Sequence, residues 1–150
     1  MLEEYSIIPM SLRHLDEVLE IEKQSFPTPW SRYAFNCELN DNEFAHYFCV
    51  THQNKVVGYM GVWVIIDEGH ITNVAIHQDY RNRGLGELLM RTVASRCLAL
   101  GVERMTLEVR TSNLIAQSLY KRLGFTSAGI RKGYYTDTQE DAIIMWKEIG

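Results

Sequence analysis

The chain has 150 residues, of which 46% are hydrophobic and 23% are charged. This length is enough for one domain with a buried core and too short for two of ordinary size, and the composition excludes disordered and fibrous proteins. The formal net charge of -4 argues against a nucleic-acid-binding protein, which usually has a basic excess. We therefore expect one folded domain over residues 1–150 that has no direct contact with nucleic acid.

The charges are divided unevenly along the chain. Residues 1–80 carry 4 basic and 12 acidic side chains, residues 81–132 carry 10 and 3, and residues 133–150 carry 1 and 4. One contiguous third of the sequence is therefore strongly cationic, and any function assigned to the protein has to account for it.

The sequence indicates neither secretion nor a membrane or metal partner. Segment 1–6 has acidic residues where a signal peptide has basic ones, and no apolar run approaches the roughly 18 residues that span a membrane. The five histidines form no H-E-x-x-H or similar cluster, so we expect no metal. Three scattered cysteines without a C-x-x-C pair are typical of small core residues in a reducing cytoplasm: Cys37, Cys49 and Cys97.

The first half of the sequence predicts two helices and then strands. Apolar residues recur at helical spacing from Leu12 to Phe26, and a loop with two prolines ends this helix at residues 26–30. Ser31 is a suitable N-cap for a second, short helix. Three runs rich in aromatic and branched residues follow: Tyr47–Thr51, Val56–Ile66 and Ile71–Ile76.

The second half alternates helices and strands. Leu85 to Leu100 carry apolar residues on one helical face, and Gly101 can end that helix in a left-handed conformation. A strand, a helix stopped by Gly124 and two closing strands follow: Met105–Val109, Leu114–Leu123, Phe125–Arg131 and Ala142–Lys147. The order ααβββαβαββ predicts an α/β (α+β) fold with a mixed sheet, because helical crossovers make part of the sheet parallel.

A glycine-containing loop, Arg81-Asn-Arg-Gly-Leu-Gly86, precedes the third predicted helix. A helix N-terminus presents unpaired N–H groups, and glycines let a phosphate approach the backbone closely, so this loop suits an anion. It lacks the third glycine of the dinucleotide fingerprint, because position 89 is Leu89, and it lacks the Gly-Lys-Ser/Thr of a P-loop. The remaining pattern is R-x-x-G-x-G, which an ordinary tight turn also explains.

This pattern resembles the pyrophosphate loop of the GCN5-related N-acetyltransferase (GNAT) superfamily, and Leu119-Tyr-Lys-Arg-Leu-Gly-Phe125 resembles its second motif, L-Y-x-x-x-G-F. Further motifs are similar to those of RimI-type ribosomal-protein alanine N-acetyltransferases. They are Asn73-Val-Ala75 before the loop, Leu107-Glu-Val-Arg-Thr-Ser-Asn113, Arg131-Lys-Gly-Tyr-Tyr135 and Asp141-Ala-Ile-Ile-Met145. The resemblance covers about Phe26 to Met145.

The resemblance implies a single GNAT-like domain with helices on both faces of a mixed sheet. Two central parallel strands splay apart, and the pantetheine arm of acetyl-CoA lies between them like an added strand. The matching cofactor-binding residues are Val74, Ala75 and Ile76 for the arm, Arg81, Asn82, Arg83, Gly84, Leu85 and Gly86 for the pyrophosphate, and Asn113 for the arm. Asn113 is equally suited to be a plain helix N-cap.

The resemblance makes Glu108 the general base that takes the proton of the acceptor amine. Strand alternation places Glu108 on the face opposite Met105, Leu107 and Val109, and half-burial beside a thioester would raise its pKa. The alternative role is an ion pair with Arg110, its neighbour on the same face.

The resemblance makes Tyr120 the general acid that protonates the coenzyme A thiolate. A phenol with a pKa near 10 is mostly protonated at neutral pH, so it is available as a proton donor. The alternative is that Tyr120 packs in the core with Ala116 and Leu123. The two roles are compatible.

The acceptor site implied by the family lies between the loop after the first helix and the late β-hairpin, which contribute Phe26, Pro27, Trp30, Tyr134 and Tyr135. Aromatic side chains with polar tips suit a peptide groove, although core or hairpin packing also explains them. The Phe-Pro-Thr-Pro-Trp loop is longer than the family's minimal F-P-W-S form.

We therefore predict a cytoplasmic acetyl-CoA-dependent acetyltransferase that modifies a protein N-terminus, above all the N-terminal alanine of a small-subunit ribosomal protein. At pH 7 roughly a tenth of α-amines is neutral and far less of lysine side chains. A lysine or small-amine acetyltransferase on the same scaffold, and a non-catalytic acyl-CoA-binding module, are the alternatives.

Overall fold

The computed structural model describes residues 4–150 and contains one seven-stranded sheet with four α-helices. The segment used to argue against a signal peptide lies partly outside this range, at residues 1–3. In chain order the elements are β1 (Tyr5–Pro9), α1 (Leu15–Ser25), α2 (Arg32–Asn40), β2 (Ala45–His52), β3 (Lys55–Ile65), β4 (Glu68–Ile76), α3 (Leu85–Ala99), β5 (Arg104–Arg110), α4 (Leu114–Arg122), β6 (Thr126–Tyr135) and β7 (Glu140–Glu148). Short 3-10 turns cover Leu12–His14 and Gln78–Tyr80.

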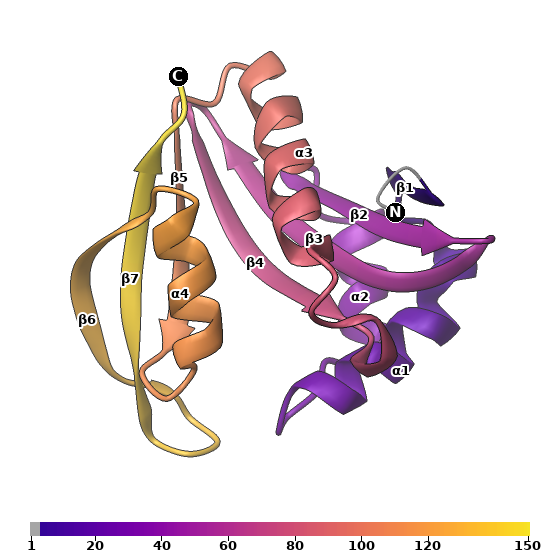
Figure 1. The fold of residues 1–150 in the computed structure, drawn as a ribbon, viewed down its shortest axis with the longest axis horizontal. Coiled ribbons are helices and arrows are strands. Elements are labelled where there is room, and N and C mark those ends of the chain that lie inside the picture. The colour runs from indigo at the N-terminus through magenta and orange to yellow at the C-terminus, as the bar shows by residue number, and fades with distance from the viewer. Residues whose placement is uncertain (1–3) are drawn as a thin grey trace.

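The sheet order is β1-β2-β3-β4-β5-β7-β6. β4 and β5 run parallel, and the other neighbouring strands are antiparallel. The parallel pair holds for three residue pairs, from Glu68↔Arg104 to His70↔Thr106, and then ends although both strands continue. Figure 1 shows β4 and β5 meeting near the C-terminal end of the chain and diverging below it. The predicted mixed sheet with splayed parallel strands is confirmed.

The first strand, β1, was not predicted from the sequence. Its five residues, Tyr-Ser-Ile-Ile-Pro, are too few for a clear alternation, and the terminal proline is typical of an edge strand because it cannot donate to a ladder. β1 pairs with β2 at the sheet edge, with Ile7 opposite Val50. Because β1 comes before α1 in the chain, the predicted order of elements lacked its first strand.

The three residues predicted to begin or end helices do so in the structure: Ser31, Gly101 and Gly124. The Ser31 hydroxyl accepts a hydrogen bond from the Ala34 N–H at 3.1 Å and caps α2. Gly101 follows α3 with φ +91°, and Gly124 follows α4 with φ +100°. Both glycines adopt the left-handed conformation that ends a helix at little steric cost.

Two apolar cores lie on opposite faces of the sheet. Val18 and Ile21 of α1 and Phe35 of α2 pack with Tyr59 of β3 on one face. Residues of α3 and α4, including Leu89 and Tyr120, pack with β5 and β7 on the other. Helices therefore cover both faces, as predicted, and on one face α3 lies with the β4 side of the gap and α4 with the β5 side (Figure 1).

Cys49 and Cys97 are buried in these cores, whereas Cys37 is half-buried. Within residues 4–150, every helix is too short or too polar to cross a membrane.

Candidate active site

A cleft of about 730 Å³ opens where β4 and β5 diverge. Its walls come from α1 and the loop after it, from β4, β5 and α4, and from the β6–β7 hairpin. The cleft brings together seven predicted catalytic and acceptor residues that are far apart in sequence: Phe26, Pro27, Trp30, Glu108, Tyr120, Tyr134 and Tyr135.

Glu108 lies on β5 just beyond the last rung that pairs with β4, and its side chain is 9% exposed. Its Oε1 is 2.8 Å from His70 Nε2 on β4 and accepts a hydrogen bond at 3.1 Å from the Tyr134 hydroxyl. Both bonds fall on Oε1, so Oε2 has no hydrogen-bond partner within residues 4–150. One carboxylate oxygen is thus held in place while the other stays open to the cleft.

The expected rise in the pKa of Glu108 is wrong. Burial does raise this pKa and is the largest single effect, but the His70 hydrogen bond and charge, the Tyr134 hydroxyl and the Arg131 charge together outweigh it and lower the pKa below its ordinary value. Hydrogen bonds and positive charge stabilise the ionised form. The carboxylate is therefore charged at neutral pH.

The alternative ion pair between Glu108 and Arg110 is also absent from the structure. The Arg110 guanidinium instead pairs with Asp137 at 2.9 Å and with Glu140 at 3.5 Å. Glu108 bonds to His70 and Tyr134, which leaves its charge directed at the cleft rather than neutralised by an arginine.

Tyr120 combines the two roles that the sequence left open. Its ring is 7% exposed and packs against Phe125 with centroids 6.0 Å apart. It also lines the cleft, and its hydroxyl makes no hydrogen bond to residues 4–150. Burial raises the pKa of Tyr120 to about 12, so the hydroxyl stays protonated at neutral pH.

The glycine loop connects β4 to α3 and contains two left-handed residues, Asn82 at φ +65° and Gly84 at φ +80°. Gly84 is the N-cap of α3, and space within 4 Å of its missing Cβ is empty. Gly86 has a different reason to be glycine, because a Cβ there would lie 3.3 Å from Leu119 of α4. The loop therefore presents an open backbone at a helix N-terminus, while Gly86 allows α3 to approach α4.

The two arginines of this loop are held by neutral groups. Arg81 donates to the Ile76 carbonyl at 2.9 Å and to the Ser25 hydroxyl at 3.2 Å. Arg83 donates to the Tyr5 hydroxyl at 3.4 Å and lies over the Tyr80 ring. Neither forms an ion pair with a carboxylate of the described chain, unlike Arg104, so their charge is available to an anion.

The remaining cofactor candidates are divided between cleft and core. Val74 and Asn113 line the cleft. The Asn113 side chain accepts from the Ala116 N–H at 3.1 Å, which confirms the N-cap role. The side chains of Ala75 and Ile76 pack on the two cores, and residues 81–86 lie beyond the cleft lining at the end of β4. Past His70, β4 no longer pairs with β5, so its backbone is free on the side facing the gap.

On the acceptor side, the aromatic residues both pack and line the cleft. Trp30 stacks on Phe35 with centroids 5.3 Å apart, and Phe26 contacts the same core. Tyr134 and Tyr135 pack edge to face with centroids 5.0 Å apart. Neither the packing role nor the groove role excludes the other, because these residues make the ring contacts described and also line the cleft.

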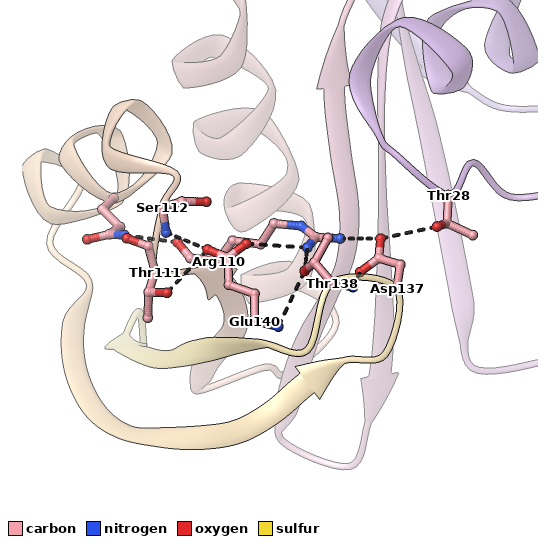
Figure 2. Close-up of polar contacts among 8 residues, drawn as sticks. Thr28, Arg110, Thr111, Ser112, Asp137, Thr138 and Glu140 are labelled. Carbon is pink, nitrogen blue, oxygen red and sulfur yellow. Dashed lines mark hydrogen bonds and ion pairs between the residues drawn. The ribbon is translucent and has the colours of Figure 1, made fainter.

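Figure 2 shows Arg110 of β5 bonded to the connection between β6 and β7, and Asp137 of that connection bonded to Thr28. The Arg110 guanidinium lies 4.0 Å from the Tyr135 ring centroid and donates to Asp137 and, at 3.0 Å, to Thr138. Asp137 accepts a second hydrogen bond, at 3.1 Å, from the Thr28 hydroxyl in the loop after α1. This bond joins the β6–β7 connection to the loop after α1, and both residues line the cleft.

Sequence reasoning missed four polar residues around the cleft. In the sequence, His70 was one of five scattered histidines. In the structure it belongs to the last residue pair between β4 and β5, where the two strands begin to diverge. Glu22 of α1, Arg110 of β5 and Asp137 of the β6–β7 connection occur in patterns that also suit a solvated surface. Only the register between distant strands and loops brings these residues together.

No group of three or more metal-ligating side chains is placed to hold a metal within residues 4–150. The open helix N-terminus at Gly84, the unpaired edge of β4 and the free charges of Arg81 and Arg83 fit a phosphate-bearing group with an extended arm.

These features define an acetyltransferase, and comparison with known proteins agrees. The family model of the acetyltransferase (GNAT) family matches residues 15–125, and the chain belongs to this family. Among its relatives, the ribosomal protein bS18-alanine N-acetyltransferase of Escherichia coli (strain K12) is 36% identical over 93% of this chain and 95% of its own. A provisionally named enzyme of the same kind from Bacillus subtilis (strain 168) is 46% identical over 93% of both chains.

Solved structures show the same fold. The Escherichia coli ribosomal-protein-S18-alanine N-acetyltransferase superposes with a TM-score of 0.89 at 34% identity, over 97% of this chain and 94% of the other. Ard1 from Thermoplasma volcanium superposes with a TM-score of 0.85 at 25% identity, over 97% of both chains. The protein is therefore an acetyl-CoA-dependent acetyltransferase of the GNAT family.

Proposed function

We propose that the protein transfers an acetyl group from acetyl-CoA to the N-terminal α-amine of ribosomal protein bS18, whose first residue would be alanine. The observation that carries this proposal is the placement of Glu108 and Tyr120 on one cleft beside an aromatic acceptor groove. The names of the similar enzymes from Escherichia coli and Bacillus subtilis support the substrate. We also propose that residues 1–150 form one N-acetyltransferase domain that acts in the cytoplasm.

Acetyl-CoA, when bound, would supply a thioester carbonyl for attack by the amine. Arg81, Asn82, Arg83 and the N–H groups from Gly84 to Gly86 would hold its pyrophosphate, because they combine free positive charge with an open helix N-terminus. The backbone of Val74, Ala75 and Ile76 would pair with the pantetheine arm. Asn113 would add a side-chain contact to the arm.

Glu108 takes the proton that the amine loses as the new C–N bond forms, directly or through a water molecule. Oε2 is the atom that performs this step, because His70 and Tyr134 occupy Oε1. Tyr120 gives its hydroxyl proton to the sulfur as the C–S bond breaks, and its pKa of about 12 keeps that proton available. Solvent in the cleft then returns both residues to their starting protonation.

The acceptor peptide would lie between Phe26, Pro27 and Trp30 on one side and Tyr134 and Tyr135 on the other. Phe26 and Trp30 pack on the core, and Tyr134 and Tyr135 pack on each other, so these rings offer apolar walls whose polar tips can bind peptide groups. This arrangement suits an extended N-terminal segment that enters from the open side of the cleft.

Intact-mass analysis of peptides incubated with acetyl-CoA tests the proposal. A peptide carrying the bS18 N-terminus should gain one acetyl group, and an Nα-acetylated peptide with a free lysine should not. Glu108→Gln and Tyr120→Phe should each lower turnover by at least about tenfold. Near-normal turnover in both variants would contradict the catalytic roles, and equal use of the lysine peptide would favour a lysine acetyltransferase.

A further inference from the structure

The β6–β7 hairpin departs from regular pairing beside the cleft. Arg131 pairs with Ala142 and Tyr135 pairs with Glu140, so three residues of β6 face the single residue Asp141 of β7. A single extra residue in a strand would turn every later side chain to the other face. Two extra residues keep the alternation and place a bulge over residues 132–134, which include Tyr134.

The bend leaves backbone groups without their ladder partners, and Asp141 satisfies one of them. Its Oδ1 accepts a hydrogen bond from the Gly133 N–H at 2.8 Å. Gly133 has φ +62°, a conformation that glycine adopts without strain. The carboxylate of Asp141 therefore takes the place of the missing strand partner and fixes the residue directly before Tyr134.

The fixed bend directs Tyr134 to the base. The Tyr134 hydroxyl donates to Glu108 Oε1 at 3.1 Å, and its ring packs edge to face on Tyr135. Asp141 thus connects to Glu108 through two successive groups, the backbone of Gly133 and the side chain of Tyr134. Its other strand contact, the Thr111 N–H to the Asp141 carbonyl at 3.3 Å, uses backbone alone and persists after any side-chain change.

We infer that Asp141 is a positioning residue for acetyl transfer, which acts by pinning the Gly133 bend so that Tyr134 holds the Glu108 carboxylate with Oε2 open to the acceptor amine. The inference rests on the proposed role of Glu108. It assigns a role to Gly133 and Asp141, two residues of the closing strands that the acceptor groove alone does not explain.

A double-mutant cycle between Asp141→Ala and Tyr134→Phe tests the connection. Each single variant should lower kcat for the bS18 peptide by about tenfold, the size expected from one hydrogen bond to a charged group. The double variant should be no slower than Tyr134→Phe alone, because both changes interrupt the same path. Equal and multiplying effects of the two changes would overturn the inference.

Matched variants separate positioning from general stability. Asp141→Asn keeps the acceptor oxygen and should restore kcat to within about twofold of the parent. Glu148→Ala removes a carboxylate at the far end of the same strand, 73% exposed and paired with Arg104, and should leave kcat unchanged. Asp141→Ala should lower the melting temperature by the same amount in the parent and in the Tyr134→Phe variant. It should lower kcat in the parent but not further in Tyr134→Phe.

A readout independent of turnover comes from NMR of protein labelled with ¹⁵N-glycine. The Gly133 amide proton should shift upfield in Asp141→Ala, return in Asp141→Asn and stay in place in Tyr134→Phe. If Asp141→Ala fails to fold, Gly133→Ala strains the same bend and replaces it in the cycle.

Failure of the proposed function has a different signature. Parent protein that leaves the bS18 peptide unmodified contradicts the substrate, and the cycle is then run on whichever peptide the mass panel shows to be acetylated. A Glu108→Gln variant as active as the parent contradicts the base. An unchanged Gly133 resonance in Asp141→Ala overturns the inference whatever the substrate.

Discussion

Glu22 offers a sharp test of how the acceptor loop is held. It lies in α1, is 2% exposed, and accepts hydrogen bonds from the Trp30 N–H at 2.7 Å and from the Tyr59 hydroxyl. Burial raises the pKa of Glu22 above its ordinary value, although both hydrogen bonds act to lower it. A buried carboxylate thus anchors the loop after α1 at an electrostatic cost.

Glu22→Ala removes the acceptor for two buried donors. Leaving such a donor unpaired costs about 1–3 kcal/mol, so the two together should lower the free energy of unfolding by about 4 kcal/mol. For a chain of this size that corresponds to a drop of about 8–16 °C in melting temperature. The KM for peptide should also rise, because Trp30 lines the cleft.

Glu22→Gln isolates the cost of the charge. The glutamine oxygen can accept from Trp30, and its NH₂ can donate to the Tyr59 oxygen. Because the folded-state pKa of Glu22 is raised, the folded protein binds more protons than the unfolded chain between the two pKa values. Stability from this carboxyl is therefore present at low pH and lost as pH rises through the folded pKa.

Urea unfolding at pH 5, 6.5 and 8 measures this difference. The stability of Glu22→Gln relative to the parent should improve as pH rises through the folded-state pKa of Glu22, and it should level off above that pKa. A difference that is flat with pH, or that moves the other way, would refute the argument that the buried charge is costly. Glu22→Gln as unstable as Glu22→Ala would show that the loop needs the carboxylate itself.

Three further predictions concern the cleft and its rim. The double variant Arg81→Glu, Arg83→Glu should raise the KM for acetyl-CoA much more than the KM for peptide, because both guanidiniums lack carboxylate partners. Equal increases of the two KM values in steady-state kinetics would refute this prediction. Thr28→Val removes the hydroxyl that bonds Asp137 and should raise the peptide KM about 2–12-fold while the KM for acetyl-CoA is unchanged. His70→Phe removes the hydrogen bond that does most to lower the pKa of Glu108, so that pKa should rise and the acidic limb of the pH–rate profile should move to higher pH. An unmoved limb would contradict this prediction.

Local sequence signals predicted most of the fold because the residues that begin and end most elements lie within those elements or directly beside them. Ser31, Gly101 and Gly124 end or begin helices through contacts within a few residues, so the pattern around them is sufficient. The site motifs placed Glu108, Tyr120 and the acceptor aromatics on one cleft correctly. Edge strand β1 was not predicted because its formation depends on β2, whose paired residues, from Pro9↔Phe48 to Tyr5↔His52, are 39 to 47 positions away in the sequence.

The electrostatics of the site could not be predicted in the same way. Alternation on β5 correctly gave the face of Glu108, but the sign of its pKa shift depends on His70, Tyr134 and Arg131, which arrive from two other strands. An ion pair with Arg110 was the alternative role for Glu108, yet Arg110 pairs with Asp137 and Glu140, which come from the end of the β6–β7 hairpin. Charge partners are set by strand register, and register is a long-range property.

The low pKa of Glu108 bears directly on the choice of acceptor. A carboxylate whose pKa lies below its ordinary value is a weak base, so it can collect a proton released during attack but gives little help in neutralising a strongly basic amine beforehand. The acceptor must then supply its own neutral fraction. At pH 7 that fraction is about 300 times larger for an α-amine than for a lysine side chain, given reference pKa values near 7.9 and 10.4. This difference belongs to the amines themselves, and a carboxylate base that is charged at neutral pH leaves it in place, so it favours the proposed N-terminal acceptor in addition to any selection by the aromatic groove.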